Sequence, residues 1–401
     1  MKHFFRLAAF LALFAFPVTE ASATGCGGGS GTCFVVAAGG NSNTNTTWTD
    51  TTGGATCTCT PAAGDAVILD SAAGQLTINA SLSVASLDAS GTGGSGSPYT
   101  NTLTQNASTT LTITGTLFRL SSSMTLTQAS GSSSVITIGV NAGSSTVTID
   151  TFGKVMGLTN LGVTSGTQTF QLASALNVTK TVASTLTFVV GTFDANGQNV
   201  TAMVFNSNNS NTRSVLMGSG TWTLGGNTNA STALTVWDTG TATGLTLTTS
   251  TAPIVIASGT SNQTFTPGAS RTFNSLTING SANGVVTLNG TSMSFSTLTA
   301  NAPAKLRVTS GTTTTFSGAI TATGSSASLV GIQATAPGVL ATISLGSDST
   351  MAWGAVQDIT TSGAGKLTAT NSFDMGGNTL ANGGTITAPA VGGSGGAIIG
   401  G

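Results

Sequence analysis

Histidine and glutamate are almost absent from this chain of 401 residues. The sequence holds one histidine, His3, and one glutamate, Glu20, and both lie close to its start. Without them the rest of the chain cannot form a Ser-His-Asp triad, a histidine zinc site or an imidazole acid–base catalyst. We therefore expect a protein that is not an enzyme and that has no catalytic residues, cofactor or bound metal.

Charge is scarce as well. Lys, Arg, Asp and Glu together make up 5% of the residues, and the formal net charge is −1. The cations do not cluster, so the sequence lacks the basic surface that nucleic-acid binding requires. Disordered segments combine low hydrophobicity with high net charge, whereas 39% of this chain is apolar. These proportions predict a folded protein that hydroxyls and amides keep soluble.

Residues 1–23 have the pattern of a secretory signal peptide. A basic start precedes the apolar run Leu7–Phe16, and Ala21 and Ala23 are small residues at the positions that a signal peptidase reads. The run is too short to span a bilayer. The residues up to Cys26 loosely resemble a lipobox, but a polar stretch separates this cysteine from the apolar run. We expect a freely exported chain without a membrane span, extracellular or at the cell surface, with the periplasm as the alternative.

Residues 24–64 contain all four cysteines, Cys26, Cys33, Cys57 and Cys59. Export makes disulfides plausible, and four thiols allow three pairings. A bridge from Cys57 to Cys59 would span one residue under strain, so we expect each of them to pair with one of the earlier two. Zinc is the weaker alternative, because C-x6-C with C-x-C departs from the usual C-x2-C spacing. This segment is interpreted as an N-terminal cap.

Short apolar/Thr alternations begin after residue 64, as in Leu76–Ile78, Leu111–Ile113 and Leu276–Ile278. Alternation of period two with β-branched residues predicts strands, and Gly, Asn and Ser clusters between them predict turns. Sandwich domains and a solenoid both fit many short strands. The absence of a domain boundary and the echo of Phe273–Ile278 by Phe295–Thr299, at a spacing typical of one coil, favour the solenoid. We predict an all-β chain with a right-handed parallel β-helix over residues 65–375 and a flexible Gly-rich tail over 376–401.

Outside the signal peptide the carboxylate side chains are ten aspartates. Asp65 and Asp70 form the closest pair and are interpreted as turn or strand-end residues. In the alternative function, a polysaccharide lyase or hydrolase, stacking of coils would bring an Asp set together beside a basic residue. The candidates for that basic residue are Lys154, Lys180, Arg213 and Arg271.

Two further groups are candidate binding sites. Asp194–Asn199 and Asp374–Asn378 offer oxygen ligands for calcium, but they lack the acidic density of a calcium loop and are interpreted as turns. Exposed aromatic side chains can stack on sugar rings, whereas packing in the core is the simpler expectation. The residues concerned are Trp48, Trp222, Trp237, Trp353 and Tyr99.

Several sequence segments resemble those of a family of uncharacterised exported proteins of bacteria and phage-derived regions. They include Gly25–Cys33, Ala55–Pro61, Asp65–Asp70, Gly220–Leu224 and Asn371–Asn378. In composition and repeat the chain is also broadly similar to adhesin-like and pectate-lyase-like right-handed parallel β-helices. The resemblance implies surface display, with surface glycans or other surface proteins as partners, and it carries over no catalytic residue.

Overall fold

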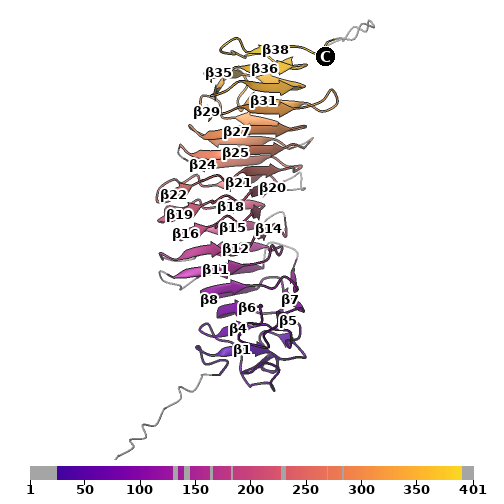
Figure 1. Ribbon diagram of the computed structural model, residues 1–401, viewed down its shortest axis with the longest axis vertical. Helices are drawn as coiled ribbons and strands as arrows, with labels where there is room; N and C mark the ends of the chain where they lie inside the picture. The colour runs from indigo at the N-terminus through magenta and orange to yellow at the C-terminus, as the bar shows by residue number, and fades with distance from the viewer. Residues whose placement is uncertain are drawn as a thin grey trace, which may run out of the picture.

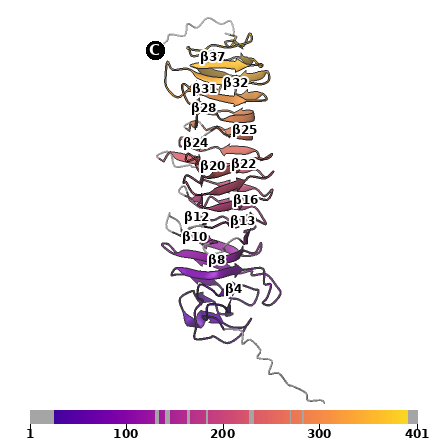
Figure 2. The same cartoon turned by 90° about the vertical axis from the view of Figure 1, so that its left-hand side faces the viewer.

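The computed structural model is a long rod of stacked coils (Figure 1). It describes residues 25–390 except 130–133, 140–144, 163–165, 182–183, 227–231, 269 and 282–283. The predicted signal peptide and the residues after 390 lie outside the described part. From residue 66 onward the coils follow one another in chain order toward the C-terminal end of the rod, as the second view also shows (Figure 2). The fold is a parallel β-helix, which confirms the predicted fold class.

The largest sheet runs along the whole rod. Its strands are β1 (Thr32–Val35), β3 (Trp48–Thr49), β4 (Ala66–Ile68), β6 (Leu82–Asp88), β8 (Thr110–Arg119), β10 (Val135–Ile138), β11 (Thr146–Asp150), β12 (Leu158–Leu161), β13 (Thr169–Leu172), β15 (Thr185–Phe188), β16 (Gly191–Asp194), β18 (Val204–Asn206), β19 (Arg213–Leu216), β21 (Leu234–Asp238), β22 (Leu245–Thr248), β24 (Gln263–Gly268), β26 (Val286–Gly290), β28 (Lys305–Val308), β31 (Val330–Ala334), β34 (Gly354–Gln357) and β37 (Phe373–Asp374).

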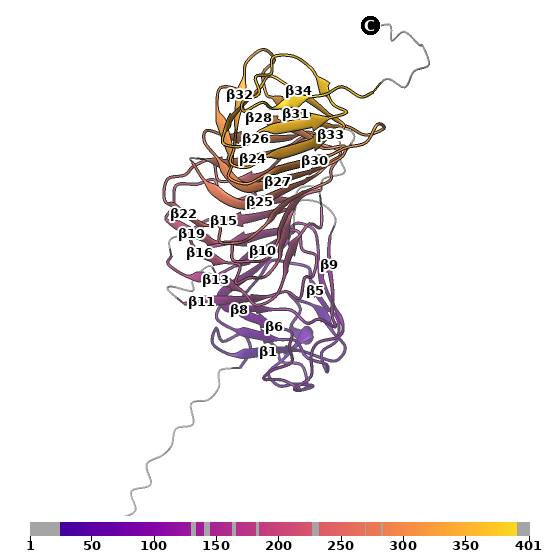
Figure 3. The ribbon, with the colours of Figure 1, turned by 45° about the horizontal axis from the view of Figure 1, so that its top comes forward.

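Two further sheets complete the coils. The second contains β14 (Leu176–Val178), β17 (Val200–Ala202), β20 (Trp222–Gly225), β23 (Ile254–Ala257), β25 (Thr272–Asn279), β27 (Ser294–Asn301), β29 (Thr313–Phe316), β30 (Ile320–Thr323), β32 (Ala341–Leu345), β33 (Ser349–Ala352), β35 (Ile359–Gly363), β36 (Leu367–Thr370) and β38 (Thr385–Ile386). A small third sheet near the N-terminal end contains β2 (Gly40–Asn41), β5 (Leu76–Ile78), β7 (Thr102–Gln105) and β9 (Thr125–Gln128). Figure 3 shows β5 and β9 set apart from β6 and β8.

Strand register confirms the repeat seen in the sequence. β25 pairs with β27 in parallel, with Phe273 opposite Phe295 and Asn279 opposite Asn301. Coil length varies widely elsewhere, because a short coil leads from Ala355 to its partner Phe373 whereas a much longer one leads from Trp222 to Ile254. The segments between the strands differ in length, while the strands keep their parallel partners with occasional bulges.

Aromatic rings form a continuous column through the core. Neighbouring centroids along it lie 4.7–6.4 Å apart, a spacing at which each pair adds about 0.5–1.5 kcal/mol beyond burial. Its members are Phe170, Phe188, Phe193, Phe205, Trp222, Trp237, Phe265, Phe273, Phe295 and Phe316. Trp48 and Tyr99 are also fully buried, so packing in the core is confirmed for them and for the two tryptophans of the column. Trp353 is half-buried.

The parallel ladder extends beyond both predicted boundaries. β1, inside the predicted cap, already pairs in parallel with β4. At the other end β38 pairs with β36 and the Thr387 N–H donates to the Ala369 carbonyl, so part of the segment predicted as a flexible tail, up to residue 387, packs on the last coil. Two amides attach this segment to the coil before it, because Asn378 Nδ2 donates to the Val356 carbonyl at 2.8 Å and Asn382 Nδ2 to the Gly363 carbonyl at 2.7 Å. The high glycine content of this segment indicated flexibility and gave no sign of these contacts.

Candidate functional site

The cap covers the first coil by reversing the chain. β3 pairs with β1 in antiparallel fashion, the only antiparallel strand pair among the described strands, and a single 3-10 turn, η1 (Asn45–Thr47), precedes it. The buried Trp48 ring donates its Nε1 hydrogen to the Ser42 carbonyl at 2.9 Å. The Trp48 carbonyl accepts from the backbone N–H of Cys57 at 2.9 Å. The second cysteine loop is thereby attached to the strand that covers the first coil.

The carboxylate of Asp65 joins separate segments of the cap by hydrogen bonds. This carboxylate is fully buried, and it accepts backbone hydrogen bonds from Gly27, Gly31 and Ala62 at 2.7–2.9 Å. Burial alone would raise its pKa, but these donors and the N–H of Gly29 outweigh burial and hold the pKa below the usual value. Gly27 has φ +90°, a left-handed conformation that favours glycine. The Gly-rich loop therefore wraps around a buried anion.

The Asp70 carboxylate also accepts hydrogen bonds, most of them from backbone N–H groups. Its Oδ1 accepts from the N–H groups of Ala72 and Ala73, and its Oδ2 accepts from Thr52 Oγ1 at 3.1 Å and Ser95 N at 2.8 Å. Both members of the closest aspartate pair thus occupy structural positions at the two ends of β4. Their many loop contacts were not foreseen from the sequence.

The cysteines pair within each segment and not across them. The bridges are Cys26–Cys33 and Cys57–Cys59, and no described cysteine is free. The predicted cross-pairing was wrong because the chain bends at residue 58 and brings the two flanking Cα atoms to 5.3 Å, inside the usual range of about 4.4–6.8 Å for bridged cysteines. Hydrogen bonds of Asp65 fold the other loop back in the same way, with 4.8 Å between the Cα atoms of Cys26 and Cys33.

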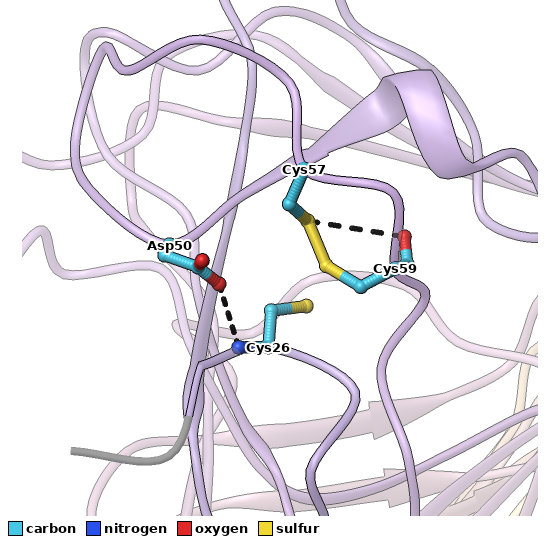
Figure 4. Close-up of side chains that lie close together, drawn as sticks. All are labelled: Cys26, Asp50, Cys57 and Cys59. Atoms are coloured by element: carbon cyan, nitrogen blue, oxygen red, sulfur yellow. Dashed lines mark hydrogen bonds between the residues drawn. A yellow bond between two sulfur atoms is a disulfide. The ribbon is translucent and has the colours of Figure 1, made fainter. Parts of the chain in front are cut away.

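A compact sulfur-and-carboxylate group lies where the two cysteine loops meet. Its ligand atoms are the sulfurs of Cys26, Cys57 and Cys59 and a carboxylate oxygen of Asp50, all within 4.8 Å of one another. Figure 4 shows the Cys26 sulfur pointing toward the Cys57–Cys59 bridge, with Asp50 beside it. Asp50 Oδ1 accepts from the Cys26 backbone N–H at 2.6 Å. Asp50 is exposed and also lines a surface cavity of about 620 Å³.

A charged stack crosses three neighbouring strands of the large sheet. Arg119 on β8 lies between Asp88 on β6 and Asp150 on β11, with nitrogen–oxygen distances of 3.5 and 3.7 Å. The second carboxylate oxygen of Asp150 is buried and has no hydrogen-bond partner. Sequence reasoning missed Arg119, because its two partners lie far from it along the chain on either side and only the strand register aligns them.

The four predicted basic residues do not join an aspartate set. None of them forms an ion pair within the described part of the chain. Lys154 Nζ donates to the carbonyls of Ser122 and Met124. The fully buried Arg213 guanidinium donates to the carbonyls of Ser207, Asn211, Thr241 and Thr243. Burial, and then the charge of Arg271, lower the pKa of Arg213, whose role is to join two loops.

A polar groove lies near the C-terminal end of the large sheet. Arg307, Gln333 and Gln357 stack in register on β28, β31 and β34 and line a cavity of about 360 Å³ with Asp358. With its amide oxygen turned to the guanidinium, Gln333 accepts from Arg307 Nε at 2.6 Å and Nη2 at 3.1 Å. Asp358 Oδ2 accepts from the Gly338 N–H at 3.0 Å. Arg307 therefore has a neutral amide, and no carboxylate, as its described partner.

The two candidate calcium loops, Asp194–Asn199 and Asp374–Asn378, form turns in which the aspartate oxygens accept hydrogen bonds from the protein itself. Asp194 Oδ1 accepts from the Asn196 N–H at 2.8 Å, and Oδ2 accepts from Gln171 at 3.0 Å. Asp374 Oδ1 accepts from the Gly376 N–H and from Asn378 Nδ2. These are Asx-type turns, as interpreted from the sequence.

The described residues include no helix with the length and apolar character needed to cross a membrane. Comparison of the chain with protein-family models, with curated proteins and with solved structures found no match.

Proposed function

We propose that this chain is an exported, non-enzymatic β-solenoid, an adhesin-like surface or structural component that contacts acidic glycans. The observation that carries the proposal is the groove lined by Arg307, Gln333 and Gln357. It lies on a rigid sheet, where strand spacing of about 4.8 Å sets planar polar groups in a row along the rod. Paired donors and acceptors at such intervals suit the hydroxyls of consecutive sugar rings.

The charge of the groove supports an acidic ligand. Arg307 is held by a neutral amide and forms no ion pair in the described part of the chain, although the Asp358 carboxylate lines the same cavity. Its planar guanidinium suits a carboxylate or sulfate bidentately. Three of the four tryptophans are buried and cannot stack on a sugar. Recognition at this groove would therefore depend on hydrogen bonds and charge.

The test is a glycan array probed with the mature chain and with two variants. We expect binding to acidic polysaccharides that Arg307→Ala reduces at least tenfold. Gln171→Ala is the matched control, because Gln171 is another outward polar residue of the same sheet, far from the groove. Absence of glycan binding, or equal binding by wild type and Arg307→Ala, would contradict the proposal.

One observation favours a second candidate, cleavage of a polysaccharide at the Asp88–Arg119–Asp150 stack. The stack has two carboxylates and one cation, and one oxygen of Asp150 has no partner. Release of reducing ends or unsaturated products from acidic polysaccharides, abolished by Asp150→Asn, would establish this alternative. Under the proposed function we expect that the chain releases neither reducing ends nor unsaturated products from these polysaccharides.

A further inference from the structure

We propose that the cap has a second, reduced state in which it binds one thiophilic divalent cation such as Zn²⁺. The ligands are the thiolates of Cys26, Cys57 and Cys59 and the carboxylate of Asp50. Their four atoms already lie within 4.8 Å of one another. Tetrahedral zinc with bonds to sulfur of about 2.3 Å needs sulfurs about 3.8 Å apart. On reduction the bonded sulfurs of Cys57 and Cys59 must therefore separate to about that distance, while all four ligand atoms start within reach of one ion.

The ligands are positioned by contacts that do not depend on the disulfides. The Asp65 carboxylate holds Gly27, next to Cys26, and Ala62, which follows Cys59 closely, through the same oxygen. Cys57 is attached to β3 by its own backbone N–H. Opening of both bridges leaves these hydrogen bonds in place, so the reduced cap retains a prearranged set of thiols.

Asp50 is oriented as a ligand by the backbone. Its Oδ1 accepts from the Cys26 N–H, which fixes the carboxylate beside the Cys26 sulfur, while Oδ2 has no described hydrogen bond. Such a second hydrogen bond is the usual way in which a metal-binding carboxylate is held in place. Because Asp50 is exposed and Cys57 and Cys59 are half-buried, an ion can reach these ligands from solvent.

The fourth cysteine belongs to a different group. The Cys33 sulfur lies with that of Cys26 and the carboxylate of Asp65, but Asp65 already accepts three backbone hydrogen bonds and is fully buried. A cation there would have to displace these donors. The site therefore uses three of the four cysteines, and Cys33 provides a built-in control.

Reduction and metal binding balance in electrons, protons and charge. A dithiol reductant supplies two electrons and two protons to each bridge, leaving two cysteine thiols and becoming a disulfide itself. Binding of the cation then releases three protons, one from each ligating thiol, because only the thiolate binds. The resulting centre of one divalent ion, three thiolates and one carboxylate has a net charge of −2.

The experiment uses the mature chain, reduced and then freed of reductant under anaerobic conditions, and titrated with Co²⁺ followed by Zn²⁺. We expect the absorption of a tetrahedral cobalt–thiolate centre to saturate at one ion per chain, zinc to displace cobalt, and three protons to be released per ion. The oxidised chain should bind none. Far-UV circular dichroism confirms that the solenoid remains folded in each sample.

Four variants separate this site from a loose collection of thiols. Cys26→Ser and Cys59→Ser should abolish the saturable step, Asp50→Asn should weaken it by more than about tenfold, and Cys33→Ser should change it little. In a disordered cap the four cysteines would be equivalent. A loss with Cys33→Ser equal to that with Cys26→Ser, an unchanged Asp50→Asn, or no saturable binding would each overturn the proposal.

Discussion

The cap and the body of the rod are held together by different means. In the cap, Asp65 fixes three backbone N–H groups, and two disulfides close short loops. In the body, an aromatic column passes from coil to coil, and strand pairs supply the backbone hydrogen bonds. The cap thus depends on polar contacts and covalent bridges at a few atoms, with Trp48 as its buried ring, whereas the body depends on apolar contacts spread along its length. Damage to the two regions should therefore produce different kinds of instability.

The largest effect is expected in the aromatic column. Trp237→Ala should lower the free energy of unfolding by about 3–5 kcal/mol, because it removes a fully buried ring in contact with Phe205, Trp222 and Phe265. Urea unfolding followed by circular dichroism measures the change. Trp353→Ala, at a half-buried ring, is the control and should lose much less. Equal losses would show that the column does not carry the stability of the body.

Removal of the buried anion should affect the cap alone. Asp65→Asn puts an NH2 donor where one carboxylate oxygen accepts, so at least one of the three charge-assisted hydrogen bonds is lost and the others are weakened, which should cost the cap about 2–3 kcal/mol. Limited proteolysis should cut the variant within residues 25–64 while the body stays intact. Asp194→Asn, in a surface turn, should leave the pattern of the wild type unchanged. Cleavage throughout the rod would show that the cap and the body unfold as one unit.

Acid should act on the same carboxylate. Because the folded-state pKa of Asp65 lies below its ordinary value of 3.8, its contribution is complete above that value and is lost as the pH falls through the lower folded-state pKa. Hydrogen exchange should show the cap opening in that range before the body. In Asp65→Asn this pH dependence should disappear, and an unchanged acid transition would assign it to another group.

The smallest effect is expected at the charged stack. Arg119 is 31% exposed in its side chain and its ion pairs are long, so Arg119→Gln should lower the free energy of unfolding by about 1 kcal/mol or less. The difference should shrink in high salt. Thermal unfolding at two ionic strengths measures it. A loss as large as that of Trp237→Ala would place a polar contact among the main supports of the body.

The solenoid could be predicted from sequence because its signals are local. Alternation in segments such as Leu276–Ile278 specifies strands, and the echo of Phe273 at Phe295 reports one coil directly. The aromatic column could not be assembled in advance, because coils of very different length destroy any fixed period between stacked side chains. The contact between Arg119 and its two aspartates was missed for the same reason.

The cap was the less predictable region because its main contacts join a carboxylate side chain to backbone N–H groups far away in the sequence. Nothing in the sequence near Asp65 indicates that its partners are the backbone N–H groups of Gly27 and Gly31, in a distant glycine loop. The bend at Thr58 that brings Cys57 and Cys59 together is equally invisible in the spacing alone. Grouping the cysteines in one cap was possible, but choosing their pairs required the folded chain.

The uneven length of the coils has a consequence for how such a protein can change. Because the ladder tolerates both the short connection from Ala355 to Phe373 and the long one from Trp222 to Ile254, a corner can gain or lose a segment while every strand above and below keeps its partner. Each corner is therefore a place where a foreign peptide could be inserted at small cost. Peptides inserted at different corners would then be separated along the rod by a whole number of coils.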